Sequence, residues 1–139
     1  MHFIVGGAFQ GKRKWACTYY RITTEHKHVV WYNGYEREYS EPDANILEQI
    51  VVLEGLEAVI RRIPDLTYWK RMFRMWHEWE RQRPDRTVVW IGSDITQGIV
   101  PIDKEERLWR DVTGWCYQDL AQLCDRVDRV WCGLAERMK

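Results

Sequence analysis

The sequence has no excess of either charge and no long hydrophobic run. Its 139 residues contain 21 Lys and Arg against 21 Asp and Glu, whereas nucleic-acid-binding domains generally carry a basic surface. No apolar stretch approaches the ~20 residues of a membrane span. Lys12, Arg13 and Lys14 follow the first apolar segment, whereas the charges of a signal peptide precede it. We therefore expect a cytoplasmic protein with no nucleic-acid partner and no membrane span.

Metal-binding spacings are also lacking. The four cysteines form no C-x-x-C pair, which argues against a zinc site. In a cytoplasmic chain such cysteines are expected to be small buried hydrophobic residues. They are Cys17, Cys116, Cys124 and Cys132. His26 and His28 alternate as on a strand edge, and two histidines alone make a poor metal site. We therefore expect no metal site built from cysteines or histidines.

The chain has no internal repeat, no low-complexity tract and no long linker, so residues 1–139 are expected to form one domain. β-branched and apolar segments predict strands at 3–5, 28–32, 51–53, 87–91 and 127–132. Helical spacing predicts helices at 12–22, 56–63, 66–83 and 105–124. This alternation predicts an α/β fold with a mostly parallel sheet flanked by helices.

The first strand runs into a glycine-rich loop with the spacing of a P-loop, G-x-x-x-x-G-K. Its residues are Gly6, Gly7, Ala8, Phe9, Gln10, Gly11, Lys12 and Arg13. Glycines let backbone N–H groups turn around a phosphate, and the following helix points its positive end at the same anion. Lys12 would reach the terminal phosphates. Arg13 stands where the Mg²⁺-binding Ser or Thr is expected, so Mg²⁺ binding is in doubt.

Two acidic residues follow predicted strands, where parallel sheets present ligand groups. Glu54 follows the 51–53 segment, and Asp94 follows the 87–91 segment. Either carboxylate could position a metal ion or accept a substrate proton. The alternative for each is an acid near a helix N-terminus, stabilised by the helix dipole.

Nine tryptophans are many for this length, and several lie on one face of the 66–83 helix. Apolar residues recur there at steps of three and four, as in an amphipathic helix. They are Leu66, Trp69, Met72, Phe73, Trp76 and Trp79. This stripe faces either the core of the domain or another subunit.

The C-terminal third carries a more specific pattern. Gly98-Ile99-Val100-Pro101 is followed at fixed distances by Arg110-Asp111, Gly114 and Gln118. These motifs resemble those of the adenosylcobinamide kinase/adenosylcobinamide-phosphate guanylyltransferase family of cobalamin biosynthesis, without a gap from Ile91 onward. The family also begins with G-G-A-x-S-G-K-S, close to the Gly6–Arg13 loop.

The resemblance implies a P-loop NTPase-like fold that binds ATP or GTP and transfers phosphoryl to adenosylcobinamide. It also implies a homotrimer. Lys12 would then neutralise phosphate charge, while Glu54 and Asp94 would position metal or hydroxyl.

The chain departs from the family at several places. Arg13 replaces the Ser of the loop, Tyr117 replaces an Asn, and the segment with the guanylyl-accepting histidine has no counterpart. Two interpretations follow: a kinase that has lost guanylyl transfer, or an inactive homologue that binds a nucleotide, corrinoid or protein.

Overall fold

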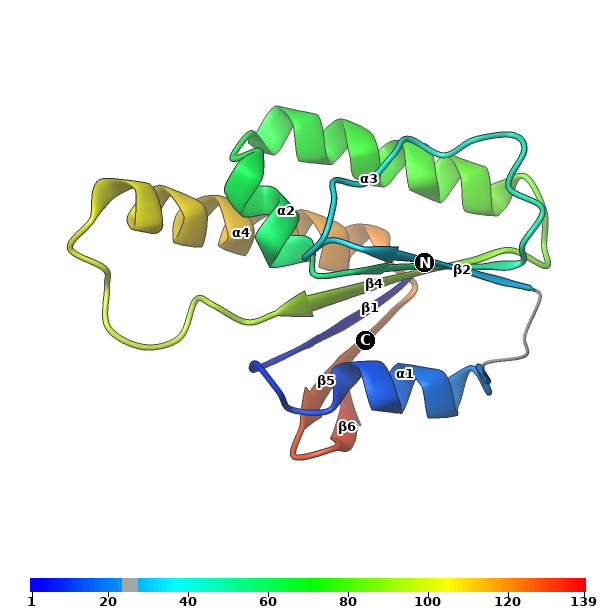
Figure 1. Ribbon diagram of the computed structural model, residues 1–139, viewed down its shortest axis with the longest axis horizontal. Coiled ribbons are helices and arrows are strands. Elements are labelled where there is room, and N and C mark those ends of the chain that lie inside the picture. Colours follow the sequence, from blue (N-terminus) through cyan, green and yellow to red (C-terminus); the bar gives the residue numbers. More distant parts are fainter. Residues whose placement is uncertain (24–27) are drawn as a thin grey trace.

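The computed structural model describes residues 1–23 and 28–139 and contains a central six-stranded sheet (Figure 1). The strand order is β2-β3-β4-β1-β5-β6; β6 alone is antiparallel to its neighbour. The strands are β1 (His2–Gly6), β2 (Val29–Asn33), β3 (Ile50–Glu54), β4 (Thr87–Ser93), β5 (Arg126–Trp131) and β6 (Leu134–Arg137). The predicted α/β class with a mostly parallel sheet is confirmed.

Helices cover both faces of this sheet, giving three layers (Figure 1). One face carries α1 (Lys12–Tyr19), and the other carries α2 (Leu56–Arg62), α3 (Leu66–Arg81) and α4 (Lys104–Leu123). None of the helices within the described ranges has the length and hydropathy needed to cross a membrane.

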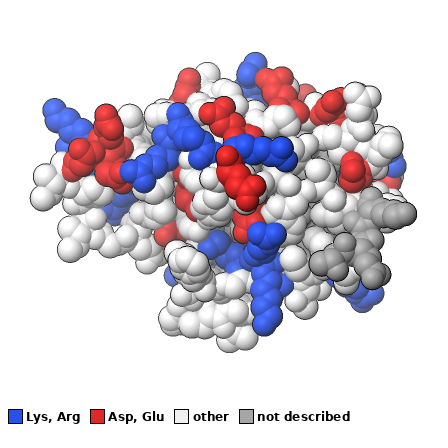
Figure 2. All heavy atoms as spheres, in the orientation of Figure 1, with Lys and Arg blue, Asp and Glu red and all other residues white. Residues whose placement is uncertain are grey.

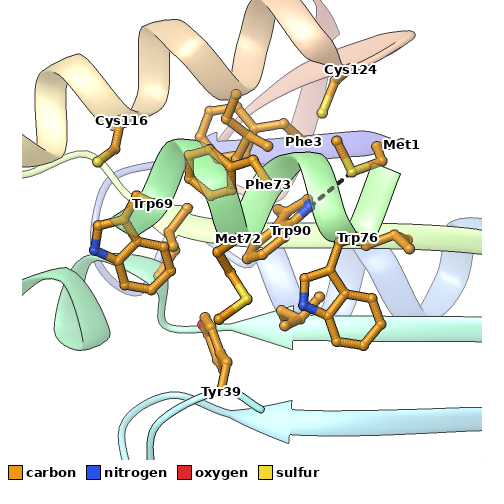
Figure 3. Close-up of a cluster of buried hydrophobic side chains, with 14 of the residues drawn as sticks. Met1, Phe3, Tyr39, Trp69, Met72, Phe73, Trp76, Trp90, Cys116 and Cys124 are labelled. Atoms are coloured by element: carbon orange, nitrogen blue, oxygen red, sulfur yellow. Dashed lines mark hydrogen bonds between the residues drawn. The ribbon is translucent and has the colours of Figure 1, made fainter. Parts of the chain in front are cut away.

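The aromatic stripe of α3 faces the core of the domain. Trp69, Phe73 and Trp76 are at most 1% exposed and pack beside Trp90 of β4 (Figure 3). The Trp90 indole N–H points to the sulfur of Met1 at 3.3 Å. Fully burying such side chains stabilises the fold by about 1.5–3 kcal/mol each. The core alternative for this stripe is therefore the one that the structure supports.

The ends of two helices show how local sequence sets their bounds. α3 begins at Leu66 because the Asp65 carboxylate accepts from the backbone N–H groups of Thr67 and Tyr68. α1 ends at Tyr19, three residues before the predicted end at 22. Arg21 there adopts a positive φ of 54°, and the last turn closes by a bond from the Ile22 N–H to the Cys17 carbonyl.

Two expectations were wrong near the C-terminus. The strand predicted over 127–132 ends at Trp131, because the next two residues form a hairpin turn into β6, which was not expected. Cys132 lies in that turn and is exposed, unlike the buried Cys116 and Cys124, while Cys17 is partly buried. A short charged edge strand such as Leu134–Arg137 leaves little hydrophobic pattern to recognise.

The strand register brings three candidate segments to one edge of the sheet. Gly6 pairs with Ser93, and Glu54 pairs with Ile91, so the carboxyl ends of β1, β3 and β4 lie side by side. The connection that follows β1 crosses to the face opposite the helices that follow β3 and β4, so a crevice is expected at this edge.

Candidate nucleotide site

The glycine-rich loop leaves β1 at Gly6 and enters α1 at Lys12. Gly11 caps the helix with φ 90°, a conformation that a side chain would strain. Phe9 also has a positive φ, 56°, and its ring is fully exposed to solvent. The loop thus holds its backbone in the left-handed conformations that turn N–H groups toward an anion.

Lys12 lies inside this loop. Its Nζ donates to the Gly7 carbonyl at 2.7 Å, the Gly6 carbonyl at 3.1 Å and the Ser93 Oγ at 3.1 Å. Burial lowers the pKa of the ammonium group, while the charges of Glu57 and Glu54 act in the opposite direction. The amine is therefore fixed at the carboxyl edge of the sheet by carbonyls that an anionic ligand could replace.

Arg13, the next residue, pairs with Glu54 from the end of β3. Its Nη1 lies 3.3 Å from the Glu54 Oε2, and its guanidinium stacks 4.7 Å from the Trp31 ring centre. The Trp31 indole N–H donates to the same Glu54 oxygen at 2.8 Å. In many P-loop proteins, the residue after the loop lysine is a Ser or Thr whose hydroxyl holds Mg²⁺. Here a guanidinium stands there, so these side chains do not fit a Mg²⁺ site.

Glu57 is a buried carboxylate in the first turn of α2 that the sequence did not single out. It accepts from the Ser93 backbone N–H at 2.8 Å and from the Tyr35 hydroxyl at 2.6 Å. Burial and the bond to Glu57 raise the pKa of Tyr35 to about 12. Glu57 thereby fixes Ser93, which in turn contacts Lys12. Its place one turn after a strand end was the signal that could have indicated it.

These groups border a cavity of about 1080 Å³. The glycine-rich loop forms one wall, and Ala58, Arg61 and Trp109 lie on the helical side. Five cationic side chains and two acidic ones line it: Lys12, Arg13, Lys14, Arg61, Arg62, Glu54 and Glu57. Figure 2 shows basic side chains, with acidic ones among them, across the middle of one molecular face. The excess of cations favours a polyanionic ligand such as a nucleotide phosphate chain.

Asp94 does not line this cavity. Its carboxylate accepts from the Thr96 N–H at 3.0 Å and from the Thr96 hydroxyl at 2.7 Å, which closes a local turn. It borders a smaller cavity of about 180 Å³ with Gly7 and Gln10 on the other side of the loop. The structure therefore brings Lys12, Arg13 and Glu54 together and directs the Asp94 carboxylate elsewhere.

The C-terminal hairpin supports the glycine-rich loop from behind. The side-chain oxygen of Gln10 accepts from the Cys132 N–H at 2.7 Å, and its carbonyl accepts from the Gly133 N–H at 2.9 Å. A Cβ added to Gly11 would lie 3.3 Å from the Gly133 Cα. The loop is thus held between α1 and the turn of the last hairpin.

The histidines that the structure describes lie at the opposite edge of the sheet. His2 begins β1, His28 directly precedes β2, and His77 borders a separate cavity together with His2. The Nε2 of His2 lies 2.7 Å from the Asp128 carboxylate, and its Nδ1 lies 2.6 Å from the Tyr20 hydroxyl. His26 lies outside the described residues.

Tyr117, at the position of the family's Asn, also supports the site. Its hydroxyl donates to the Ser93 carbonyl at 2.8 Å, and burial raises the pKa of this phenol well above its ordinary range. The ring packs so closely on Gly92 that an added Cβ would lie 2.3 Å from the hydroxyl oxygen. Tyr117 thus fixes the end of β4 from α4.

Comparison with known proteins gives one family. The model of the family described as cobinamide kinase / cobinamide phosphate guanyltransferase matches residues 48–138, about two thirds of the chain. The matched range includes Glu54, Glu57 and Asp94, and it begins after the glycine-rich loop. No curated protein sequence matches the chain.

Proposed function

This chain belongs to the cobinamide kinase / cobinamide phosphate guanyltransferase family, and we propose that it binds ATP or GTP and phosphorylates adenosylcobinamide. The triphosphate would lie over the Gly6–Arg13 loop. Family membership supports a role in cobalamin biosynthesis, and a cytoplasmic location is part of the proposal.

The placement of Lys12 carries this proposal. Its amine is buried at the carboxyl edge of the sheet, next to a cavity of about 1080 Å³ whose lining includes five cationic and two acidic side chains. A phosphate group entering the loop would replace the neutral carbonyl partners of Nζ with a partner of opposite charge, which forms a stronger hydrogen bond with the ammonium group. The energy of that exchange favours an anion specifically at the loop.

The proposed reaction uses few side chains, because phosphoryl transfer depends mainly on positioning and charge neutralisation. The hydroxyl oxygen of adenosylcobinamide would form a bond to the γ-phosphorus while the bond to the bridging oxygen breaks. The nucleoside diphosphate leaves with that electron pair, and the hydroxyl proton passes to the Glu54 carboxylate. Lys12 and Arg13 would neutralise the phosphate oxygens.

We favour phosphoryl transfer over guanylyl transfer. Guanylyl transfer in the resembling family uses a histidine nucleophile, and the chain has no counterpart of that segment. His2, His28 and His77 lie at the sheet edge remote from the cavity. The guanylyltransferase half of the family activity is therefore not included in the proposal.

One observation favours a second function, binding without turnover. The Arg13 guanidinium pairs with Glu54, the carboxylate that would receive the proton. If that pair persists in the complex, the nucleotide or corrinoid binds and no transfer follows.

Calorimetry with ATP and GTP, followed by a phosphorylation assay on adenosylcobinamide, tests both functions. We expect binding of at least one nucleotide, and a weakening of roughly tenfold or more in Lys12→Ala because a charged contact is lost. Lys104→Ala removes an exposed lysine outside the cavity and should leave affinity unchanged. Binding without product would favour the second function, and an unchanged affinity in Lys12→Ala would contradict the loop as the site.

A further inference from the structure

Arg13, Glu54 and Trp31 form a connected group beside the glycine-rich loop. The Glu54 Oε2 accepts from the Trp31 indole at 2.8 Å and lies 3.3 Å from the Arg13 Nη1. The guanidinium lies 4.7 Å from the centre of the Trp31 ring. The three side chains come from α1, β3 and β2, so the arrangement belongs to the tertiary structure.

The Glu54 carboxylate is already engaged in this group. Its side chain is 13% exposed, and one oxygen serves both Trp31 and Arg13. A divalent cation needs free oxygen ligands, whereas the guanidinium offers only donors and a fixed positive charge. Arg13 thus excludes a divalent cation from this position, because its charge repels the cation and its N–H groups cannot coordinate it.

The same guanidinium remains available to a ligand. The Arg13 side chain is 62% exposed and lines the cavity next to Lys12. Guanidinium groups have five N–H donors, so pairing with one carboxylate oxygen leaves donors for phosphate. Stacking on Trp31 limits the orientations of the group, which reduces the entropy lost when a phosphate binds.

We propose that this site binds nucleotide phosphates free of divalent cation, with the Arg13 guanidinium supplying the positive charge. The inference rests on the proposed nucleotide binding. It concerns only the form of nucleotide that the site takes. Five cationic and two acidic side chains line the cavity, and Arg61 also pairs with Glu106 outside the lining. The remaining excess of cations supplies compensating charge for a metal-free triphosphate.

The experiment is calorimetric titration of the full chain with ATP and GTP, in EDTA and in excess Mg²⁺. We expect the affinity in EDTA to equal or exceed that in Mg²⁺. A gain of more than about threefold on adding Mg²⁺, or about 0.6 kcal/mol, would overturn the inference and leave the proposed function intact. Failure of both nucleotides to bind under either condition would overturn both.

Two variants separate the charge of Arg13 from its structural contacts. Arg13→Ser restores the hydroxyl that holds Mg²⁺ in other P-loop proteins. This variant should bind nucleotide about tenfold or more weakly than wild type in EDTA, and Mg²⁺ should restore part of the lost affinity. Arg74→Ser makes the same change at an exposed position of α3 outside the cavity and should behave as wild type. Circular dichroism checks that each variant is folded. An Arg13→Ser protein with wild-type affinity in EDTA would contradict the role given to the guanidinium.

Glu54→Gln gives the opposite test. The amide removes a negative charge beside the phosphates while keeping an oxygen for Trp31. We expect the affinity for metal-free nucleotide to be retained or increased. A loss of affinity that appears in excess Mg²⁺ and is absent in EDTA would show that the carboxylate binds the nucleotide through the divalent cation, against the inference.

Discussion

At the scale of single residues, the site depends on buried charges whose partners come from different elements. Lys12 is held by carbonyls of its own loop and by the Ser93 hydroxyl. The Glu57 carboxylate accepts from the backbone N–H of Ser93 and from the hydroxyl of Tyr35. A change at Glu57 should therefore alter the position of Ser93 and, through it, the contacts of Lys12, although Glu57 and Lys12 are not bonded to each other.

Glu57→Gln tests this connection. The amide has one acceptor oxygen where the carboxylate has two, so it cannot accept from both the Ser93 N–H and the Tyr35 hydroxyl. We expect a loss of about 1–3 kcal/mol in the free energy of unfolding, measured by urea denaturation. Glu78→Gln on the exposed side of α3 is the matched control and should change stability by less than about 0.5 kcal/mol. Equal effects of the two variants would contradict the role given to Glu57.

The sequence predicted the residues of the loop and of the strand ends, because glycine spacing and apolar runs are local signals. It did not predict the Arg13–Glu54 pair, since this depends on the lateral register of β3 beside β4 and on the direction of α1. Asp94 was placed after the correct strand, yet its carboxylate bonds to Thr96 two residues ahead. Such local competition for a side chain is not visible in spacing alone.

At the scale of elements, β1 and β5 meet so closely at the loop that no side chain fits between them. A Cβ on Gly6 would lie 2.1 Å from the Val130 carbonyl oxygen, a backbone atom that cannot move aside. The same residue begins the glycine-rich loop. Strand packing and the start of the site are therefore fixed by one position.

Gly6→Ala should force β1 and β5 apart. We expect a loss of roughly 3 kcal/mol or more in stability, measured as a fall in melting temperature, together with weaker nucleotide binding. Gly114→Ala is the matched control, because its Cβ would have only an ordinary contact 3.5 Å from Thr96. Within α4 it should stabilise by about 0.5–1 kcal/mol. A Gly6→Ala protein as stable as wild type would rule out the close approach.

At the scale of the whole molecule, the two edges of the sheet carry different chemistry. The carboxyl edge carries the cation-lined cavity, and the amino edge carries the buried pair of His2 and Asp128. Burial lowers the pKa of His2 to about 4, although the Asp128 carboxylate opposes this shift. His2 is thus neutral in the folded protein at pH values where the unfolded chain takes up a proton.

This difference predicts how stability depends on pH. The contribution of His2 is fully present above its ordinary pKa of 6.5 and is lost as the pH falls toward about 4. We expect the free energy of unfolding to decrease by roughly 3 kcal/mol across that window, measured by denaturant titration. His2→Gln keeps a donor toward Asp128 and should flatten the slope. An unchanged slope in this variant would assign the dependence to other groups.

Self-association remains a prediction, but it now rests on exposed apolar residues other than the aromatic face of α3. The aromatic face of α3 is used in the core, whereas exposed apolar side chains lie in the loop before α4 at Ile99, Val100 and Ile102. We expect a trimer by light scattering at micromolar concentration, disrupted by Ile102→Glu. A mass of 16.9 kDa, that of one chain, would contradict this expectation.

The contact between Gln10 and the turn at Cys132 and Gly133 has a consequence for motion. Any ligand that orders the loop must also order the turn, and the coupling is reciprocal. Amide hydrogens of Cys132 and Gly133 should therefore exchange more slowly when nucleotide is bound, with Gln10→Ala removing most of that protection. Opening of the last hairpin would, in turn, speed nucleotide dissociation. The turn of the last hairpin would thus affect the lifetime of a nucleotide complex.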